Sequence, residues 1–375
     1  MVYLDNAATT FPKPREVYEN VDWMQRNMAV NVGRGSYKAA RVAGDILVEA
    51  KGLLAKLVRI NEADKVFFTP SATIAANEII GGIRWDKLKN VYVSPFEHNA
   101  IMRPLELMRK KYGFSIYELP FDAETQVLKE DEMLRLFVNR EPDYVFINHV
   151  SNVTGNILPL DTIGAAVKKH GGKVIVDGSQ SVGLLNIDMS TEPIDYLIFA
   201  GHKNLYSSWG VGGFIMSDVD GLEPYITGGT GSDSLNMNMS GYEAGSANII
   251  AISSLKESIK WITEIGITNI ESKKKGLVKM LIDELRAAGA QLYLPADLNN
   301  HTSVVSFNVS GYEPSEVGLI LDQDFDIAVR TGYHCAPLVH KLIGTELSKG
   351  TVRASVGYFN TEEDVRQLIA AIKEL

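Results

Sequence analysis

The sequence contains only one cysteine, Cys335, and no long uncharged apolar run. A single cysteine cannot form an internal disulfide, so we expect a reducing compartment, most simply the cytoplasm. No apolar run approaches the roughly 18 residues that a membrane helix needs, so no membrane span is predicted. The first ten residues, MVYLDNAATT, lack the charged start and apolar core of a signal peptide, and export is not expected.

Basic residues are also comparatively few. The 37 Lys and Arg side chains are outnumbered by 46 Asp and Glu, which gives a formal net charge of −9. Nucleic-acid binding is driven by clustered Lys and Arg, so this balance argues against nucleic acid as the main partner. The length of 375 residues exceeds what one hydrophobic core usually supports. We therefore expect two domains, or one large domain with a smaller one beside it.

The first two thirds of the chain alternate between short apolar segments and longer mixed ones. The apolar segments are rich in β-branched and aromatic residues, as buried strands are, and several of the intervening segments have helical character. This alternation predicts βαβ units and a mostly parallel sheet covered on both faces, with functional residues in the loops after the strands. The expected strands are 66–69, 91–94, 144–148, 173–176, 196–199 and 212–216, and the expected helices are 73–83, 100–112, 130–139 and 159–170.

The pattern changes after Gly228. A Gly, Ser and Asn-rich loop at 228–246 is followed by a long helical region at 249–288, a strand at 304–311 and a final helix at 361–375. The loop is longer than a minimal connection, which makes it a candidate binding loop. We expect a large domain at 16–245 and a smaller α+β domain formed by 1–15 and 246–375.

Two charged residues follow neighbouring strands of the expected sheet. Asp177 ends the strand in KVIVDGSQSVG, and Lys203 follows the next strand in YLIFAGHKNLY. Taken alone, Asp177 is as readily explained by a structural role, as a helix N-cap or a turn carboxylate, as by a functional one. Taken alone, Lys203 is most simply a solvated loop residue. Together they match pyridoxal phosphate, which needs a lysine for its Schiff base and an acid to keep its ring nitrogen protonated.

Other groups follow strands at the same sheet edge. Thr73 lies in FTPSAT, where a strand runs into a helix start whose free N–H groups suit a phosphate. His98 in SPFEHNA would stack on an aromatic ring, or is simply a capping or surface histidine. Asn152 in HVSNVTG would donate to a phenolate or carboxylate oxygen. Each signal is weak alone, and their convergence on one edge favours the cofactor.

The ordered motifs of the chain resemble one family. YLDNAATT, EHNA, HVSNVTG, VDGSQS, GHK, EAGSAN, RTGYHCA and VRASVGYFNTEEDV together resemble the class V, fold type I pyridoxal-phosphate enzymes, and within them the cysteine desulfurases. The form of the cysteine loop is similar to the second group of desulfurases, which includes selenocysteine lyase-like members. The resemblance covers essentially the whole chain and implies the fold type I architecture and a homodimer.

The resemblance also implies roles for individual residues. Lys203 would carry the cofactor, Asp177 would pair with its ring nitrogen, Gln180 would contact its phenolic oxygen, and Cys335 would accept the sulfur. Arg353 suits an amino-acid carboxylate on its own chemistry, although without the resemblance a surface ion pair is the favoured interpretation. The remaining implied contacts are His98 on the ring, Ala72, Thr73 and His202 at the cofactor with Ser246 of the partner subunit, and Asn152, Ala8 and Asn31 at the substrate.

The implied reaction converts L-cysteine, or L-selenocysteine, to L-alanine and leaves sulfur or selenium for an acceptor, which we expect to be a protein. Attack requires the Cys335 thiolate, so positive charge from Arg330 or a proton-accepting His334 would help. The alternatives are a selenocysteine lyase, a cysteine sulfinate desulfinase, or a class V aminotransferase or epimerase in which Cys335 is not essential. A non-catalytic family member that binds without turnover is a further alternative.

Several positions depart from the family pattern. The hydroxyl that usually precedes GHK is absent because Phe199 and Ala200 stand there, so we expect one phosphate contact to be lost. The other departures surround the substrate and the dimer-facing loop, and they bear on the substrate more than on the cofactor. They are Gly33, Trp209, Gly241, Ala247 and Tyr333.

Overall fold

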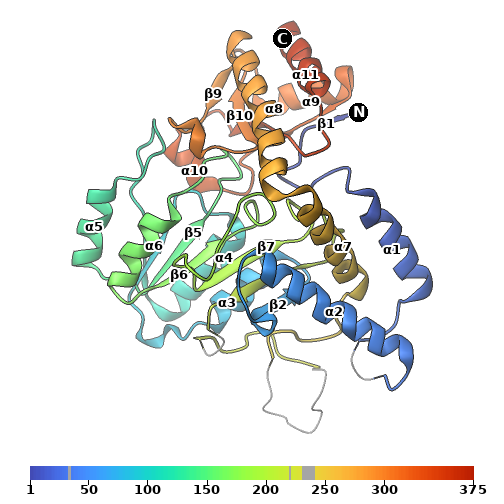
Figure 1. Ribbon diagram of the computed structural model, residues 1–375. Helices are drawn as coiled ribbons and strands as arrows, with labels where there is room; N and C mark the ends of the chain where they lie inside the picture. The colour runs from blue at the N-terminus through green and yellow to red at the C-terminus, as the bar shows by residue number, and fades with distance from the viewer. Residues whose placement is uncertain (33–34, 219–220, 230–240) are drawn as a thin grey trace.

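The computed structural model describes residues 1–32, 35–218, 221–229 and 241–375. Gly33 and most of the candidate binding loop at 228–246 therefore lie outside the described residues. Figure 1 shows two layers of structure, with a large sheet and its helices below and a smaller, C-terminal α/β layer above. Among the described helices, none combines the length and apolar character needed to cross a membrane.

A seven-stranded sheet forms the centre of the larger part, in the order β2-β8-β7-β6-β5-β3-β4. The pairs from β7 through β6, β5 and β3 to β4 are parallel, whereas β8 runs antiparallel to both β7 and β2. The strands are β2 (Val66–Thr69), β3 (Asn90–Val93), β4 (Ser115–Glu118), β5 (Tyr144–Asn148), β6 (Lys173–Asp177), β7 (Tyr196–Ala200) and β8 (Gly212–Met216). The prediction of a mostly parallel sheet is confirmed.

Both faces of this sheet are buried under helices. Successive residues of a strand point to opposite faces, so neighbouring residues enter different cores. Val145 and Ile147 pack into one apolar core, and Phe146 between them packs into another. The first core is closed by α2 (Lys38–Leu57), α5 (Glu130–Asn139), α6 (Leu160–Lys169) and α7 (Ile249–Ile265), and the second by α3 (Ala72–Gly82) and α4 (Asn99–Tyr112).

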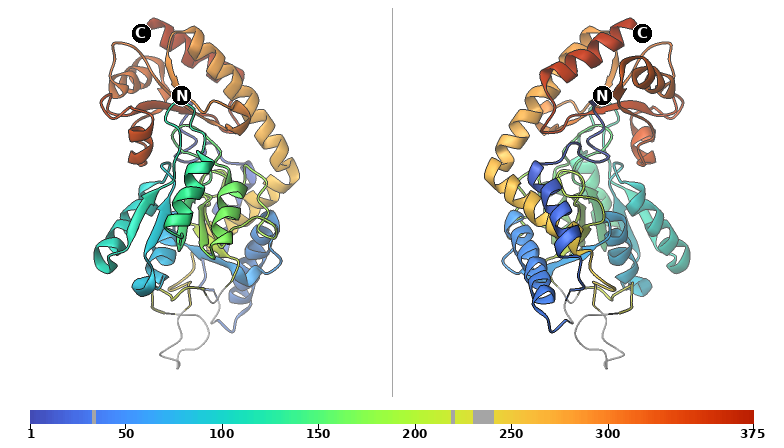
Figure 2. Two further views of the ribbon diagram at one scale, coloured as in Figure 1. Left: turned by 90° about the vertical axis from the view of Figure 1, so that its left-hand side faces the viewer. Right: turned by 90° about the vertical axis from the view of Figure 1, so that its right-hand side faces the viewer.

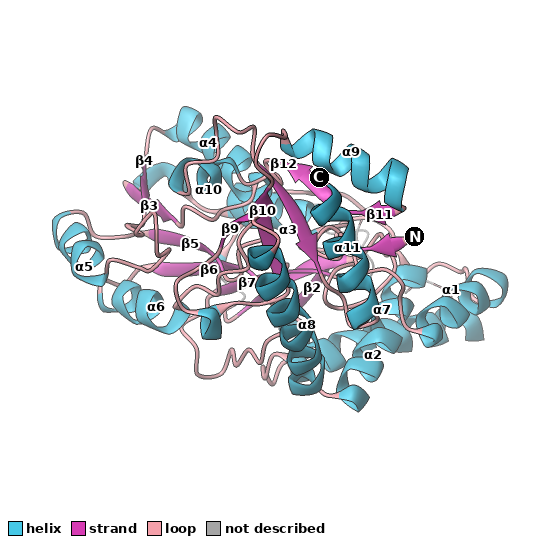
Figure 3. Cartoon of the chain, turned by 90° about the horizontal axis from the view of Figure 1, so that it is seen from above, coloured by secondary structure: helices cyan, strands magenta, loops and turns pink. Residues whose placement is uncertain are grey.

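The smaller layer is built on a four-stranded antiparallel sheet in the order β12-β13-β10-β9. Its helices pack on these strands and on one another, and Figure 3 shows α8 and α11 beside β10. A separate parallel pair joins the first strand of the chain to β11. The elements are β1 (Val2–Tyr3), α8 (Ile267–Ala287), β9 (Gln291–Tyr293), β10 (Val304–Asn308), α9 (Pro314–Phe325), β11 (Ile327–Ala328), β12 (Arg330–Gly332), α10 (Pro337–Leu342), β13 (Thr351–Ser355) and α11 (Glu362–Glu374).

One long helix connects the two layers. Figure 2 shows α8 running along one side of the molecule from the large sheet to the small one. Its first turns, at Ile270, belong to the core of the large sheet, and its later turns, from Leu277, belong to the core of the small sheet. The predicted helical region at 249–288 is thus two helices, because Gly266, with φ of +85°, separates α7 from α8.

The other predicted helices and strands are present in the structure, and the main difference is that several observed elements were not predicted. The expected strands and helices of the large sheet are all present within two residues of their predicted ends. The elements whose bounds were not predicted from the sequence are helices α1 (Arg15–Asn27), α2, α9 and α10 and strands β1, β4, β9, β11, β12 and β13. The division of the chain into residues 16–245 and the two flanking segments stays a prediction.

Candidate active site

One pocket gathers most of the residues that the sequence singled out. It lies where β5, β6 and β7 end, and is completed by the starts of α3 and α4, the N-terminal segment and the cysteine turn. The predicted residues that line it are Ala8, Ala72, Thr73, His98, Asn152, Asp177, Gln180, His202, Lys203, Cys335 and Arg353. Asn31 and Ser246 line a different pocket, so this chain does not bring them to Lys203 and their roles stay predictions.

Asp177 and Lys203 lie at the ends of adjacent parallel strands. Asp177 is the last residue of β6, is 6% exposed, and accepts a hydrogen bond from the Ser179 N–H at 2.9 Å. Lys203 follows β7, the neighbouring strand. Burial lowers the pKa of Lys203, while the nearby Asp177 carboxylate works against that shift. A lysine with a lowered pKa reaches its nucleophilic amine form more readily at neutral pH.

The start of α3 offers an anion site at one end of the pocket. The Ser71 side chain caps the helix by accepting from the Ile74 N–H, so the first helical N–H groups, at Ala72 and Thr73, stay without helical partners. Gly212 on β8 packs directly against the first residue of α3, since a Cβ at position 212 would lie 2.7 Å from the Ala72 nitrogen.

His202 lies at the same end of the pocket. Its Nδ1 atom is buried and has no hydrogen-bond partner among the described residues. Its ring stacks on Trp209 at 4.1 Å between centroids, and burial, assisted by Lys203 and Lys13, lowers its pKa to about 3. A neutral imidazole with a free ring nitrogen is therefore available to a ligand in the pocket.

His98 caps helix α4. Its Nδ1 accepts a hydrogen bond from the Ala100 N–H at 3.0 Å, which places the proton of the neutral ring on Nε2. Burial, followed by the charge of Lys203, lowers the pKa of His98 to about 4. The capping role that the sequence allowed for His98 is confirmed, and the residue also lines the pocket. Its stacking on a cofactor ring stays a prediction.

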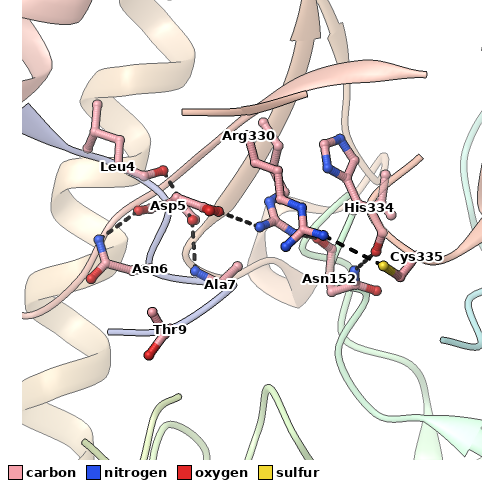
Figure 4. Close-up of polar contacts among 12 residues, drawn as sticks. Leu4, Asp5, Asn6, Ala7, Thr9, Asn152, Arg330, His334 and Cys335 are labelled. Carbon is pink, nitrogen blue, oxygen red and sulfur yellow. Dashed lines mark hydrogen bonds and ion pairs between the residues drawn. The ribbon is translucent and has the colours of Figure 1, made fainter. Parts of the chain in front are cut away.

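Arg353 provides a buried cation at another wall of the pocket. It is 1% exposed, and its Nη2 contacts the Asp5 carboxylate at 2.6 Å while its Nη1 donates to the Asn152 carbonyl at 2.9 Å. Asn152 in turn donates from its side chain to the His334 carbonyl at 2.7 Å. Figure 4 shows this row of polar contacts between the N-terminal segment and the cysteine turn. The sequence alternative of a surface ion pair for Arg353 is wrong, because Arg353 itself is buried.

The cysteine turn is short and conformationally unusual. His334 and Cys335 both have left-handed backbone angles, with φ of +49° and +60°. Arg330 Nη2 lies 3.6 Å from Cys335 Sγ, so the positive charge that was expected near this sulfur is present. The His334 Nε2 contacts Thr351, and burial lowers the pKa of His334 well below its ordinary value, so its part as a proton acceptor for the thiol stays a prediction.

Three polar residues of this region were not predicted as functional. Asp5 pairs with Arg353, Glu97 is buried one residue before His98, and Asn204 directly follows Lys203. Burial raises the pKa of Glu97 to about 8, and its Oε1 accepts from Ser94 and from the Asn148 N–H. Asp5 and Glu97 lie inside the motifs YLDNAATT and EHNA, and Asn204 directly follows GHK, so proximity to the motifs was the available signal.

The lining residues fit pyridoxal phosphate. Buried polar atoms without partners in the described chain lie on His202, Asn152 and Arg353, all at the pocket wall, as a polar ligand requires. The open α3 start and His202 suit a phosphate, and Asp177 and Lys203 supply the acid and the amine. The contacts of Gln180 differ from the expectation in one respect, because its Nε2 here donates to the Ala7 carbonyl at 2.7 Å.

Comparison with known proteins identifies the family. The aminotransferase class-V family model matches residues 2–368. A probable cysteine desulfurase of Pyrococcus abyssi is 31% identical over all of this chain and 94% of its own length. Two solved structures are similar: an apo cysteine desulfurase of Thermococcus onnurineus (TM-score 0.92, 29% identity, 99% and 94% of the two chains covered) and the cysteine desulfurase CsdA of Escherichia coli (TM-score 0.88, 26% identity, 100% and 94% covered). The predicted family and fold are confirmed, and the chain belongs to the aminotransferase class-V family.

Proposed function

We propose that the protein is a pyridoxal-phosphate-dependent cysteine desulfurase that converts L-cysteine to L-alanine and receives the sulfur on Cys335. The observation that carries the proposal is that Lys203, Asp177, Arg353 and Cys335 line one pocket. These four groups supply a cofactor amine, a cofactor acid, a carboxylate site and a thiol. The names of its relatives, cysteine desulfurases at 26–31% identity, support the same activity.

The cofactor would be held at three places. Lys203 would bind it covalently, Asp177 would accept the proton of its ring nitrogen in a hydrogen bond, and the α3 start with His202 would hold its phosphate. When bound, the cofactor supplies an electron sink for the electrons released from the substrate Cα–H bond. Lys203 lines the pocket and would take the Cα proton on Nζ, and the lowering of its pKa by burial favours the free amine that this step needs.

Sulfur transfer then involves one bond made and one broken. Arg353 holds the substrate carboxylate in the pocket, which fixes the substrate relative to Cys335. The Cys335 thiolate, stabilised by Arg330, attacks the substrate sulfur, so that an S–S bond forms and the Cβ–S bond breaks. The carbon product takes up a proton and leaves as L-alanine. The overall balance is L-cysteine plus a thiol giving L-alanine plus a persulfide on Cys335.

Product analysis tests the proposal. The protein loaded with pyridoxal phosphate is incubated with L-cysteine, L-selenocysteine or L-cysteine sulfinate under a reductant, and alanine and the released sulfur or selenium species are measured. We expect alanine and sulfide from L-cysteine, and loss of both in Cys335→Ser. Alanine release from L-cysteine at the full rate in Cys335→Ser would refute sulfur transfer to this thiol. Activity confined to selenocysteine or to sulfinate would assign the protein to the alternative reactions.

A spectrum tests the cofactor separately. The loaded protein is expected to show a visible absorption band that is lost in Lys203→Ala. Lys279→Ala is the matched control, because Lys279 is 79% exposed on α8 and pairs with the exposed Asp283. A wild-type protein that stays colourless with pyridoxal phosphate would contradict every enzymatic alternative together.

We also propose a homodimer, a cytoplasmic location and a protein as sulfur acceptor. Trp209 is 64% exposed beside His202, and Ser246 is exposed, so a second copy would cover both and bring its own Ser246 near the phosphate end. A reducing compartment would keep the Cys335 thiol free. Light scattering coupled to size-exclusion chromatography measures the mass, and a monomer at 41.3 kDa would contradict the dimer.

A further inference from the structure

Two arginines stand side by side at the wall of the pocket. Arg330 on β12 and Arg353 on β13 are directly opposed in the antiparallel register, and both line the pocket. Like charges at opposed positions of a sheet repel each other. Arg353 is also 1% exposed, so water does not screen its charge. A buried cation in this position needs a fixed anionic partner.

Asp5 is that partner, and it reaches Arg353 from outside the pocket. Its Oδ1 lies 2.6 Å from Arg353 Nη2 and, unlike Arg353, Asp5 does not line the pocket. The second terminal nitrogen, Nη1, donates to the Asn152 carbonyl at 2.9 Å. One contact therefore fixes each end of the guanidinium, and its Nε stays buried without a partner among the described residues. Figure 4 shows Asp5 on the N-terminal segment, with Arg330 and Cys335 to one side of it.

The backbone around Asp5 is itself fixed to the strand that carries Arg353. Asp5 bridges Ser355, two residues after Arg353, and the Asn6 N–H donates to the Ser355 carbonyl at 3.3 Å. The Asn6 side chain is held by the same carbonyl at 3.0 Å, and a Cβ on Gly357 would come within 2.4 Å of it. The Asp5 carboxylate therefore has little freedom to leave the guanidinium.

We propose that Asp5 is a positioning residue for the substrate carboxylate. It clamps Arg353 from the side away from the pocket, offsets the repulsion by Arg330 and keeps the free edge of the guanidinium directed at the substrate. The inference rests on the proposed function in one respect, namely that an amino-acid carboxylate binds Arg353. It assigns to the first residues of the chain a part in selecting substrates that carry a carboxylate.

The test compares a ligand that has a carboxylate with one that lacks it. L-alanine and ethylamine differ only by the carboxylate, and their binding to the loaded protein is followed by the change in its visible absorption. In Asp5→Asn we expect the Kd for L-alanine to rise about 10-fold while that for ethylamine changes less than about 2-fold. With L-cysteine as substrate, KM rises by a similar factor and kcat changes little, because the lost contact acts on binding.

The control is Asp326→Asn. Asp326 lies next to the same small β1–β11 pair, and its carboxylate is 74% exposed and pairs with the N-terminal amine. This substitution makes the same chemical change away from the pocket, and it should leave both Kd values unchanged. Circular dichroism of each variant checks that the fold is retained.

Three results would overturn the inference. They are an unchanged Kd for L-alanine in Asp5→Asn, an equal weakening of ethylamine, or tighter L-alanine binding, which would mean that Asp5 competes with the substrate. If Asp5→Asn does not fold, Asp5→Ser removes the carboxylate with a smaller polar side chain, and an unchanged L-alanine Kd there is equally decisive. If wild type releases no alanine from L-cysteine but the L-alanine effect holds, the proposed function fails and the inference stands.

Discussion

Lys274 is a buried cation whose removal makes a quantitative prediction. It lies on α8, where that helix passes from the large to the small sheet, and is 1% exposed. Its Nζ donates to the Asn204 side-chain oxygen at 2.8 Å, and Asn204 donates to the Gln180 carbonyl at 2.6 Å. Burial lowers the pKa of Lys274 from 10.5 to about 7. Lys274→Met replaces the ammonium with an apolar side chain of similar length.

The magnitude and sign follow from linkage. Between pH 7 and 10.5 the unfolded chain holds more protons at this site than the folded one, so the folded state gains stability as pH rises. The penalty for the buried charge is about 4 kcal/mol at pH 7 and falls to about 1.5 kcal/mol at pH 9.5. The variant escapes this penalty, but it leaves the Asn204 oxygen without a donor, at a cost of about 1–3 kcal/mol that does not depend on pH.

The expected result is a pH-dependent difference between two proteins. The free energy of unfolding of the cofactor-free protein is measured by urea titration at pH 7.0, 8.2 and 9.5 for wild type and Lys274→Met. The variant's advantage over wild type should shrink by about 3 kcal/mol across this range, since other titrating groups are common to both. Lys279→Met, an exposed position on the same helix, should show no such trend. A difference independent of pH would refute a lowered pKa at Lys274.

Two further predictions concern residues beside the pocket. The free energy of unfolding of Glu97→Gln, measured by urea titration, should rise by about 3 kcal/mol relative to that of wild type between pH 5 and pH 8. The raised pKa of about 8 makes the folded wild type lose stability as the pH rises through this range, whereas Gln does not titrate. A pH-independent difference would contradict this. Gly212→Ala should weaken pyridoxal phosphate binding, measured by absorption titration, because the new Cβ would meet the Ala72 nitrogen at 2.7 Å. Gly52→Ala in α2 meets nothing within 4 Å and should leave binding unchanged while stabilising the helix by about 0.5–1 kcal/mol.

The residues that the sequence predicted best are those tied to strand ends. Asp177 and Lys203 follow apolar segments whose pattern marks buried strands, and parallel strands place their carboxyl ends at one edge. The closeness of these two residues therefore follows from the local sequence pattern and the sheet topology alone. Helices α1 and α2 were not predicted because the sequence argument relied on helices that alternate with strands. These two helices instead pack against α7.

The Asp5–Arg353 pair shows what local pattern cannot supply. The two residues lie 348 positions apart, and their contact depends on β1 joining β11 and on the bridge from Asp5 to Ser355. Neither strand pairing has a periodicity signal, because β1 and β11 contain two residues each. The family resemblance assigned Arg353 to the substrate but gave no partner to hold it. Non-local pairing of very short strands thus limits prediction of the site.

The cysteine turn bears on how sulfur leaves the protein in the proposed function. Only four residues, 333–336, separate β12 from α10. The Cys335 carbonyl accepts from the Asn99 N–H at 2.7 Å, and the His334 carbonyl accepts from Asn152. Two non-glycine residues with left-handed angles, each costing about 1–3 kcal/mol, persist because these bonds hold them. The thiol is therefore presented at a fixed position, and the sulfur acceptor must approach it rather than wait for a swinging loop.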